Sequence, residues 1–361
     1  MQTPQNPLPK STISADVTDR QFFGLPSERQ IAYLQPYCEK NQIPMGEPLP
    51  SRDISVVIQG PIFTQTHEWA PKGITYQVVQ NIRKFLPEAT IIVATWEGQP
   101  LDVLAGLDID KILTLPDPGT VSFYTKGYQT DNLNNNCNRL IYSTQQGLAV
   151  VQTPYVLKIR SDLLMFHPML SCFFGQFDSP DKLDTKWQVL SQRILSFPMF
   201  SITYEQGTNR HGKKVNQPRP FHVSDWAYFG NTGDVRRLFD CPLVPEPQTS
   251  RWFETRPKPE NDIWAQRLWR YSPEQYITSN LAERRLGIHL EHASQDTPEI
   301  IDASERFIAN NFVILDQKLW GLWSLKLQHY QDELKKFIPA GLYHFDNWHK
   351  DYEKYCELPL D

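Results

Sequence analysis

The stretch YVLKIRSDLLMF, residues 155–166, places charged side chains inside what otherwise reads as a buried strand. Successive side chains of a strand point to opposite faces, so Val156, Lys158, Arg160 and Asp162 are expected to share one face. Burying three charges on an apolar strand is costly unless each charge finds a partner. The pattern therefore predicts a central strand whose end lines a polar site.

The segments around this strand predict an alternating α/β pattern. Four segments read as strands, namely 53–61, 89–98, 110–119 and 155–166. Apolar residues at helical spacing indicate helices at 75–87 and 132–151, the second capped by Asn134 or a neighbour. Short links between such elements favour a mostly parallel sheet with helices on its faces, which binds ligands beyond the carboxyl ends of its strands.

The pattern changes outside this α/β region. Residues 1–50 are rich in proline and predict an N-terminal extension with one short helix near 30–38. The later segments predict a loop at 178–222, a strand, turn and short helix at 223–239, an amphipathic helix at 257–271, and a helix at 322–338.

Composition limits the functional class. The chain has 361 residues, of which 40% are hydrophobic, and a net charge of −5, so it can bury a sizeable core and lacks the basic surplus of a nucleic-acid binder. Its five cysteines are scattered, which argues against a disulfide framework and for a reducing compartment. No signal peptide or run of 18 apolar residues is present. These features predict a cytoplasmic protein without a transmembrane segment, and they leave peripheral contact with the inner membrane open.

Several motifs together resemble the WavE-type lipopolysaccharide synthesis proteins. They are SVVIQGPI (55–62), IRKFLPEATIIVATWEG (82–98), DPG (117–119), NNNCNRLIYSTQQGL (134–148), YVLKIRSDLLM (155–165) and SDWAYFG (224–230). The resemblance implies a GT-A-like (Rossmann-like) domain that transfers sugar from a nucleotide-sugar donor to a glycan or lipid-linked glycan acceptor in surface polysaccharide. It implies a domain at 51–300, with a donor half at 51–170 and an acceptor half at 171–300, followed by a helical C-terminal extension at 301–361.

The acidic motif of GT-A enzymes is altered in this chain. Where such enzymes usually carry Asp-x-Asp for a divalent metal, this chain has Arg160, Ser161 and Asp162. Asp162 remains the candidate ligand for Mg²⁺ or Mn²⁺, with His289 of GIHLEH (287–292) as a second candidate. The plain alternatives are an ion pair for Asp162 and a surface position for His289.

Sugar transfer leaves negative charge on a departing diphosphate, which calls for cations and helix amides near the strand ends. Arg160 and Arg139 suit this role because a guanidinium fork matches phosphate oxygens. The full set of predicted donor contacts is Gln59, Gly60, Pro61, Trp96, Asp117, Asn135, Asn138, Arg139, Arg160 and Asp162. Ion pairs, helix caps and turns are the structural alternatives for these residues.

The attacking hydroxyl needs a base, and the acids of the second half are the candidates. They are Asp225 in SDWAYFG, and Asp262 or Glu260 in PENDIW. Asp262 also fits a helix cap. Trp226 and Tyr228 beside Asp225 suit either stacking on an acceptor sugar or a place in the core.

Two other functions remain open from the sequence. A sugar nucleotidyltransferase would share the fold, but QGPIFTQTHEW after the first strand lacks the glycine-rich, cationic loop expected of it. A non-catalytic binding or scaffold protein of polysaccharide assembly is the other alternative, because the first acid of Asp-x-Asp is missing.

Overall fold

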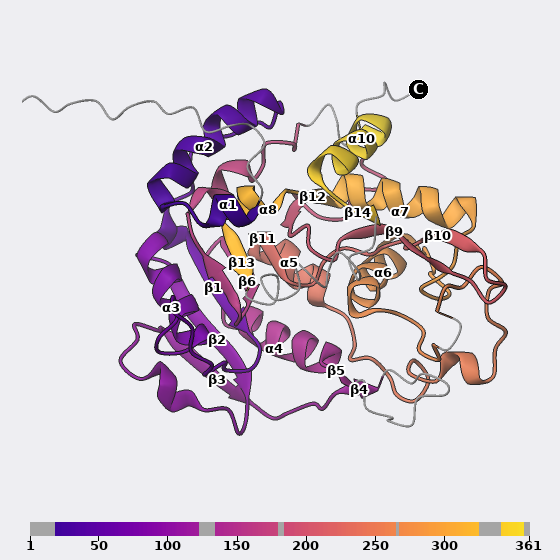
Figure 1. Cartoon of the computed structure of the whole chain (residues 1–361), viewed down its shortest axis with the longest axis horizontal. Helices are drawn as coiled ribbons and strands as arrows, with labels where there is room; N and C mark the ends of the chain where they lie inside the picture. The colour runs from indigo at the N-terminus through magenta and orange to yellow at the C-terminus, as the bar shows by residue number, and fades with distance from the viewer. Residues whose placement is uncertain (1–18, 123–133, 180–183, 265–266, 325–340, 357–361) are drawn as a thin grey trace, which may run out of the picture.

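The computed structural model describes residues 19–122, 134–179, 184–264, 267–324 and 341–356 (Figure 1). A seven-stranded sheet lies at its centre in the order β12-β8-β11-β6-β1-β2-β3. These strands are β1 (Ile54–Gln59), β2 (Thr90–Trp96), β3 (Lys111–Leu115), β6 (Tyr155–Arg160), β8 (Ile194–Ser196), β11 (Ala227–Asn231) and β12 (Phe312–Ile314). All neighbours pair in parallel except β11, which is antiparallel to both β6 and β8. The predicted α/β fold with a mostly parallel sheet is confirmed.

Helices cover the sheet, which explains why β1 is buried at every position. The helix α4 packs on β1, β2 and α5, whereas α3 packs against the short strand β7. The helices are α1 (Asp19–Phe23), α2 (Ser27–Lys40), α3 (Ile74–Phe85), α4 (Cys137–Ala149), α5 (Thr232–Phe239), α6 (Pro273–Leu286), α7 (Pro298–Asn311), α8 (Gln317–Trp320) and α10 (Phe345–Cys356). No helix of the described ranges is long and apolar enough to cross a membrane.

Most elements of the first half lie where the sequence predicts them, and Asn136, two residues after Asn134, is the N-cap of α4. The opening stretch differs from the prediction in one respect. The strand β6 stops at Arg160, Ser161 and Asp162 form a turn, and β7 (Leu163–Met165) pairs with β13 (Leu322–Ser324) in a separate sheet. Asp162 is therefore not on the strand face of Lys158 and Arg160.

The second half holds three corrections. The predicted loop at 178–222 contains β8 of the central sheet and a hairpin of β9 (Ile202–Thr208) and β10 (Lys214–Pro218), which also pairs with β14 (Gly341–Leu342). The hairpin is polar on both faces, so it shows no apolar alternation. The predicted helix at 322–338 begins as strand β13, and its remainder lies outside the described residues.

The helix predicted at 257–271 is also wrong for the residues described there, which form turns and irregular chain. Pro257 and Pro259 cannot donate backbone hydrogen bonds to a helix. The helix begins later, at Pro273, where the Ser272 hydroxyl accepts a 3.2 Å hydrogen bond from the Gln275 amide.

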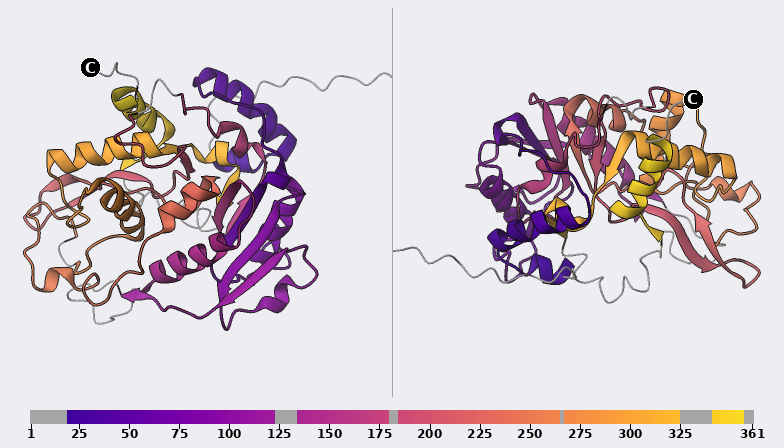
Figure 2. Two further views of the ribbon diagram at one scale, coloured as in Figure 1. Left: turned by 180° about the vertical axis from the view of Figure 1, so that it is seen from behind. Right: turned by 90° about the horizontal axis from the view of Figure 1, so that it is seen from above.

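The helices α2 and α10, near the start and the end of the described chain, lie on the same side of the molecule (Figures 1 and 2). The Tyr37 hydroxyl of α2 donates to Asp316, just before α8, at 2.9 Å. Leu49 donates its amide to Ser171 at 3.1 Å, so residues 19–50 pack on the domain. Residues 301–361, predicted as a helical extension, also supply β12 to the central sheet.

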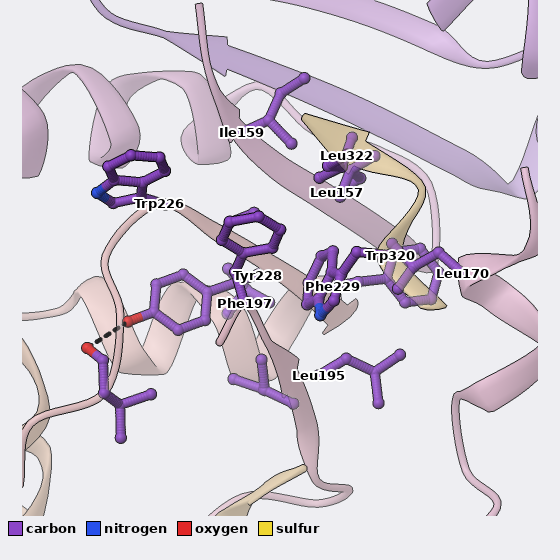
Figure 3. Close-up of a cluster of buried hydrophobic side chains, with 14 of the residues drawn as sticks. Leu157, Ile159, Leu170, Leu195, Phe197, Trp226, Tyr228, Phe229, Trp320 and Leu322 are labelled. Carbon is purple, nitrogen blue, oxygen red and sulfur yellow. Dashed lines mark hydrogen bonds between the residues drawn. The ribbon is translucent and has the colours of Figure 1, made fainter. Parts of the chain in front are cut away.

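Side chains of β6, β8, β11 and α8 form the core beneath the sheet edge (Figure 3). The rings of Phe197 and Trp226 are stacked with centroids 6.2 Å apart, and Phe197 meets Trp320 edge-on at 5.6 Å. The remaining short elements are β4 (Val121–Ser122) and β5 (Asn134–Asn135), with 3-10 turns η1 (Ser51–Asp53), η2 (Leu101–Leu104), η3 (Met169–Phe173) and η5 (Trp252–Glu254).

Gly147 of α4 tests the packing of helix on sheet. An added Cβ would lie 2.5 Å from Val57 and 3.3 Å from Ala94, so Gly147→Ala should lower the free energy of unfolding by about 1–3 kcal/mol, as overpacked cores do. Gly233→Ala in α5 is the matched control, because its Cβ would meet nothing within 4 Å. Urea denaturation should show loss for the first and no loss for the second; equal stabilities would contradict this packing.

Candidate functional site

Strand ends from distant parts of the chain meet at one edge of the sheet. Gln59 is the register partner of Arg160, so the ends of β1 and β6 lie side by side. Because β11 runs in the opposite direction, its start lies at the same edge, opposite Ile159. Asp225 and Trp226 therefore enter the edge beside Arg160, where ligands of such sheets bind.

Arg160 and Asp162 form a bidentate ion pair at this edge. Nε donates to Oδ1 and Nη2 donates to Oδ2, both at 2.8 Å. The guanidinium carbon lies 4.4 Å from the ring centre of Trp226. Asp162 is buried, while 20% of the Arg160 side chain is exposed, and Nη1 has no hydrogen-bond partner within the described part of the chain. Arg160 thus keeps a donor for a further anion.

A second pair repeats this arrangement at the end of β3. Arg139 of α4 donates through Nε to Asp117 Oδ1 at 2.8 Å and through Nη2 to Oδ2. Its guanidinium lies 4.9 Å from the ring centre of Trp96. The hydrogen bond from Arg139 holds the pKa of Asp117 below its usual range. The Asp-Pro-Gly turn is therefore anchored to the first turn of α4.

Lys158 is fully buried at the centre of the sheet. Its Nζ donates to the main-chain oxygen of Asp225 and lies 5.9 Å from the ring centre of Tyr228 and 5.6 Å from that of Phe239. Burial lowers the pKa of Lys158 to about 7. The first charge of the opening stretch is thus satisfied by the chain that leads into β11.

Glu274, in the first turn of α6, faces the same group of charges. Only 13% of its side chain is exposed, and burial together with the negative charge of Asp225 raises the pKa of Glu274. His222 Nε2 lies 3.8 Å from Oε2 of Glu274. Burial lowers the pKa of His222 to about 3, and its Nδ1 donates to the Phe200 carbonyl at 2.9 Å. The imidazole is therefore neutral and adds no cation to stabilise an ionised Glu274.

A small cleft lies between the start of α4 and the start of α6. Its walls include Asn135, Cys137, Tyr271, Ser272 and Pro273. Both helices present the positive end of their dipole here, which favours an anionic ligand. Because Glu274 directly follows the lining residue Pro273, the cleft adjoins Glu274.

Several predicted donor contacts have structural partners. An added Cβ at Gly60 would lie 2.6 Å from the hydroxyl of Ser161, and that hydroxyl donates to the Pro61 carbonyl at 2.6 Å. Gln59 is buried and its side-chain oxygen accepts from Ser143 at 3.3 Å. The positive φ of Gly60, 132°, makes this turn a glycine position. This loop is tied to the end of β6.

The two asparagines at the start of α4 also serve the fold. Asn135 accepts from the Cys137 amide at 2.7 Å, and buried Asn138 accepts from the Val244 amide at 2.7 Å. Trp226 and Tyr228 are both buried, as expected for the core alternative rather than for stacking on an acceptor.

The other two candidate bases lie in a different network. Asp262 is buried, accepts from the Trp264 amide at 2.8 Å and pairs with Arg267 at 3.0 Å. The Glu260 side chain is 81% exposed and pairs with Arg210. Of the three candidate bases, Asp225 alone has Lys158, Arg160 and Glu274 as charged neighbours. Asp225 is also buried, and no side chain of the described residues donates to its carboxylate.

The donor set does not fit a divalent metal. Both oxygens of Asp162 accept from Arg160, and His289 bonds Glu283 through Nδ1 at 2.8 Å and Arg270 through Nε2 at 3.1 Å. Across the described ranges, no three His, Cys, Asp or Glu side chains gather as a metal site. Metal binding by Asp162 and His289 stays a prediction without a supporting ligand cluster.

Glu274 and His222 are the site residues that sequence reasoning missed. Ser272, Pro273 and Glu274 carry a recognisable helix start, with a capping hydroxyl, proline and an acid in the first turn. An acid at this position of a helix is usually exposed. Nothing in the neighbouring sequence therefore predicts that Glu274 is largely buried near Asp225.

These observations define an α/β protein with two Arg–Asp pairs and two further, largely buried acids at the carboxyl edge of its sheet. The model of the WavE lipopolysaccharide synthesis family matches residues 54–361. The chain therefore belongs to this family, and family membership supports a role in lipopolysaccharide synthesis. No curated protein sequence matches the chain.

Solved structures resemble the chain only weakly. 4-Diphosphocytidyl-2C-methyl-D-erythritol synthase from Anaerococcus prevotii matches with 11% identity and a TM-score of 0.29 over 54% of this chain and 81% of that chain. A cytidylyltransferase from Leptospira borgpetersenii matches with 10% identity and a TM-score of 0.31 over 81% of this chain and 99% of that chain. Similarity at this level carries no argument about function.

The raised pKa of Glu274 predicts a pH dependence of stability. Between about pH 4.5 and the raised value, the folded protein keeps a proton that the unfolded chain releases, so stability falls as pH rises. Glu274→Gln removes this loss. Relative to the wild type, the free energy of unfolding of this variant should therefore rise by up to about 3 kcal/mol between pH 5 and pH 7.5, since one pKa unit is about 1.4 kcal/mol.

Urea denaturation at both pH values measures this difference. Glu260→Gln is the matched control, because that side chain is exposed and should leave the pH dependence unchanged. Parallel wild-type and Glu274→Gln curves would show that Glu274 titrates normally.

Proposed function

We propose that this WavE-family protein is a glycosyltransferase that moves a sugar from a nucleotide-activated donor to a growing surface glycan. The observation that supports this most is that the carboxyl edge carries two Arg–Asp pairs, each beside a tryptophan ring, and that one of them, Arg160–Asp162, neighbours the acids Asp225 and Glu274. The edge joins cations for a leaving diphosphate with acids for an attacking hydroxyl.

The donor diphosphate would lie near Arg160 and Arg139. Arg160 keeps Nη1 free within the described residues, and the α4 and α6 helix starts add partial positive charge. As the sugar–phosphate bond breaks, its electron pair leaves with the nucleotide diphosphate, and these groups stabilise that charge. The steps proposed here use only these side chains and helix starts.

Asp225 is the proposed base. The acceptor hydroxyl gives its proton to the Asp225 carboxylate while its oxygen bonds to the anomeric carbon. Glu274, with its raised pKa, holds a proton near neutral pH, so that the pair carries one negative charge instead of two. Lys158 positions Asp225 through the hydrogen bond to its main-chain oxygen.

A non-catalytic binding or scaffold role is the alternative. Its supporting observation is that Arg160 and Arg139 already have carboxylate partners, as purely structural arginines would. A sugar nucleotidyltransferase has no such observation in its favour.

Thermal unfolding with UDP, GDP, CDP, CMP or dTDP, each with and without Mn²⁺, tests donor binding. We expect one nucleotide to raise Tm, because a ligand at one hundred times its Kd adds about 2.7 kcal/mol. Arg160→Lys should reduce this shift by at least half, because an ammonium cannot replace the planar fork. Arg284→Lys, in an exposed pair with Asp240, is the control. No shift with any nucleotide would favour the scaffold role.

Asp225→Asn tests the base. The amide cannot accept the proton, so transfer to a glycan should fall by about 10²-fold or more while the nucleotide-induced Tm shift remains. Incorporation of a radiolabelled sugar from the donor into a glycan fraction measures transfer. Full activity in this variant would remove Asp225 from the reaction.

A further inference from the structure

A second group of cations lies on the irregular segment that precedes α6. It consists of Trp252, Arg256 and Arg270, here termed the Trp252 cluster. The guanidinium carbons of Arg256 and Arg270 lie 3.6 Å and 3.9 Å from the ring centre of Trp252. Cation–π contacts of this kind contribute about 0.5–1 kcal/mol each at exposed sites. One indole therefore holds two positive groups together.

Neither guanidinium of the cluster has a carboxylate partner within the described residues. Arg256 donates to the Trp252 carbonyl and the Thr255 hydroxyl, both at a long 3.4 Å. Arg270 donates to the Glu291 carbonyl at 2.6 Å and to His289. On the same segment, Arg251 pairs with Glu254 at 3.0 Å. Within the described residues, the two guanidinium groups of the cluster thus lack the direct carboxylate contact that the neighbouring Arg251 has.

The two charges are held at an energetic cost. Burial lowers the pKa of Arg270, and the positive charge of Arg256 also lowers it, whereas the negative charges of Glu283 and Glu291 raise it. An anion between the two guanidinium groups would remove this repulsion and use their remaining donors. The arrangement is that of an anion site, and not of a stabilising surface network.

Arg270 is oriented by a chain of hydrogen bonds. Glu283 accepts from Nδ1 of His289, which leaves Nε2 to accept from Arg270. The guanidinium also lies 4.5 Å from the ring centre of Tyr271. The side chain is therefore fixed before any ligand arrives.

The cluster adjoins the cleft described above. Tyr271 follows Arg270 and lines the cleft, and the Arg270 amide donates to the carbonyl of Thr249, another lining residue, at 2.8 Å. A ligand that reaches from the cleft past Tyr271 would therefore meet the cluster.

We propose that the Trp252 cluster binds a phosphate or carboxylate group carried by a sugar of the acceptor glycan. That this glycan is the acceptor rests on the proposed function, whereas its negatively charged group is inferred from the cluster itself. The two arginines bind the anionic group, and the substrate class becomes a glycan with an acidic substituent near the receiving sugar.

Nearby side chains favour a glycan over an anionic membrane surface. Trp264 is 42% exposed, and an exposed indole suits the apolar face of a sugar ring. Lys258, 5.5 Å from the ring centre of Phe253, donates to the Trp264 carbonyl and so joins Trp264 to this segment. The exposed acid Glu260 would be repelled by a flat anionic surface.

Calorimetric titration of the full chain at low salt tests the proposal with tetragalacturonate, glucose 6-phosphate and the neutral maltotetraose. We expect at least one anionic sugar to bind, and Arg256→Gln/Arg270→Gln to weaken it about tenfold, as loss of hydrogen bonds to charged groups does. The affinity for maltotetraose should be the same in the wild type and in this variant.

Arg251→Gln is the matched control, because it removes one charge from the same segment without touching the cluster. Arg256→Gln alone, at an exposed position, keeps the test valid if the double variant unfolds. Failure of both anionic sugars to bind at several millimolar, or equal weakening by Arg251→Gln, would overturn the proposal. If the protein instead sediments with phosphatidylglycerol vesicles, in a way that depends on the cluster, and binds no sugar, that result would overturn the proposal and identify the partner of the cluster as an anionic membrane surface.

The nucleotide-induced Tm shift is measured on the same proteins to separate the two hypotheses. A shift that persists in all variants while sugar binding is lost supports the cluster as a separate subsite. Sugar binding without any nucleotide shift would remove the transferase assignment and leave the anionic-sugar site in place. A nucleotide-induced Tm shift without sugar binding would support the transferase assignment and remove the anionic-sugar site.

Discussion

The buried ammonium of Lys158 is the constraint on which the site depends. It lies at the centre of the sheet and donates to the main-chain oxygen of Asp225, immediately before β11. A buried ammonium without a partner costs several kcal/mol, so the chain at this point cannot move away without a large penalty. This hydrogen bond joins a parallel strand to the only antiparallel strand of the central sheet and fixes Asp225 beside Arg160.

The charges at the edge balance in a way that suits an anionic ligand. Arg139 pairs with Asp117, and Arg160 pairs with Asp162. Asp225 and Glu274 have Lys158 nearby, whose lowered pKa of about 7 leaves it only partly charged at neutral pH, so two ionised acids would give a negative excess. A proton on Glu274 removes this excess. The tryptophans beneath Arg160 and Arg139 then hold each guanidinium without adding charge. A diphosphate therefore meets an edge that does not repel it.

The sequence predicted the donor half of the fold well, because its buried strands and amphipathic helices have strong local patterns. It also placed Arg160 and Asp117 at one edge, since strand ends of a parallel sheet must meet. Asp225 was predicted only as a candidate base, without a place at this edge. It failed where long-range contacts decide the structure. The polar β9–β10 hairpin has no alternation, and the helix at 257–271 does not form. Glu274 resembles any exposed acid of a first helical turn until α6 packs against α5 and Glu274 comes near Asp225.

The order of strands in the sheet also governs when the site forms during synthesis. The strands β1, β2, β3 and β6 pair with one another and come from the first half of the chain, whereas the far edge ends with β12, at Phe312–Ile314. A ribosome must therefore add more than one hundred residues after β8 before that strand gains its outer neighbour β12. Until then the nascent chain exposes an unpaired strand edge, which is a surface prone to aggregation and a natural target for chaperones.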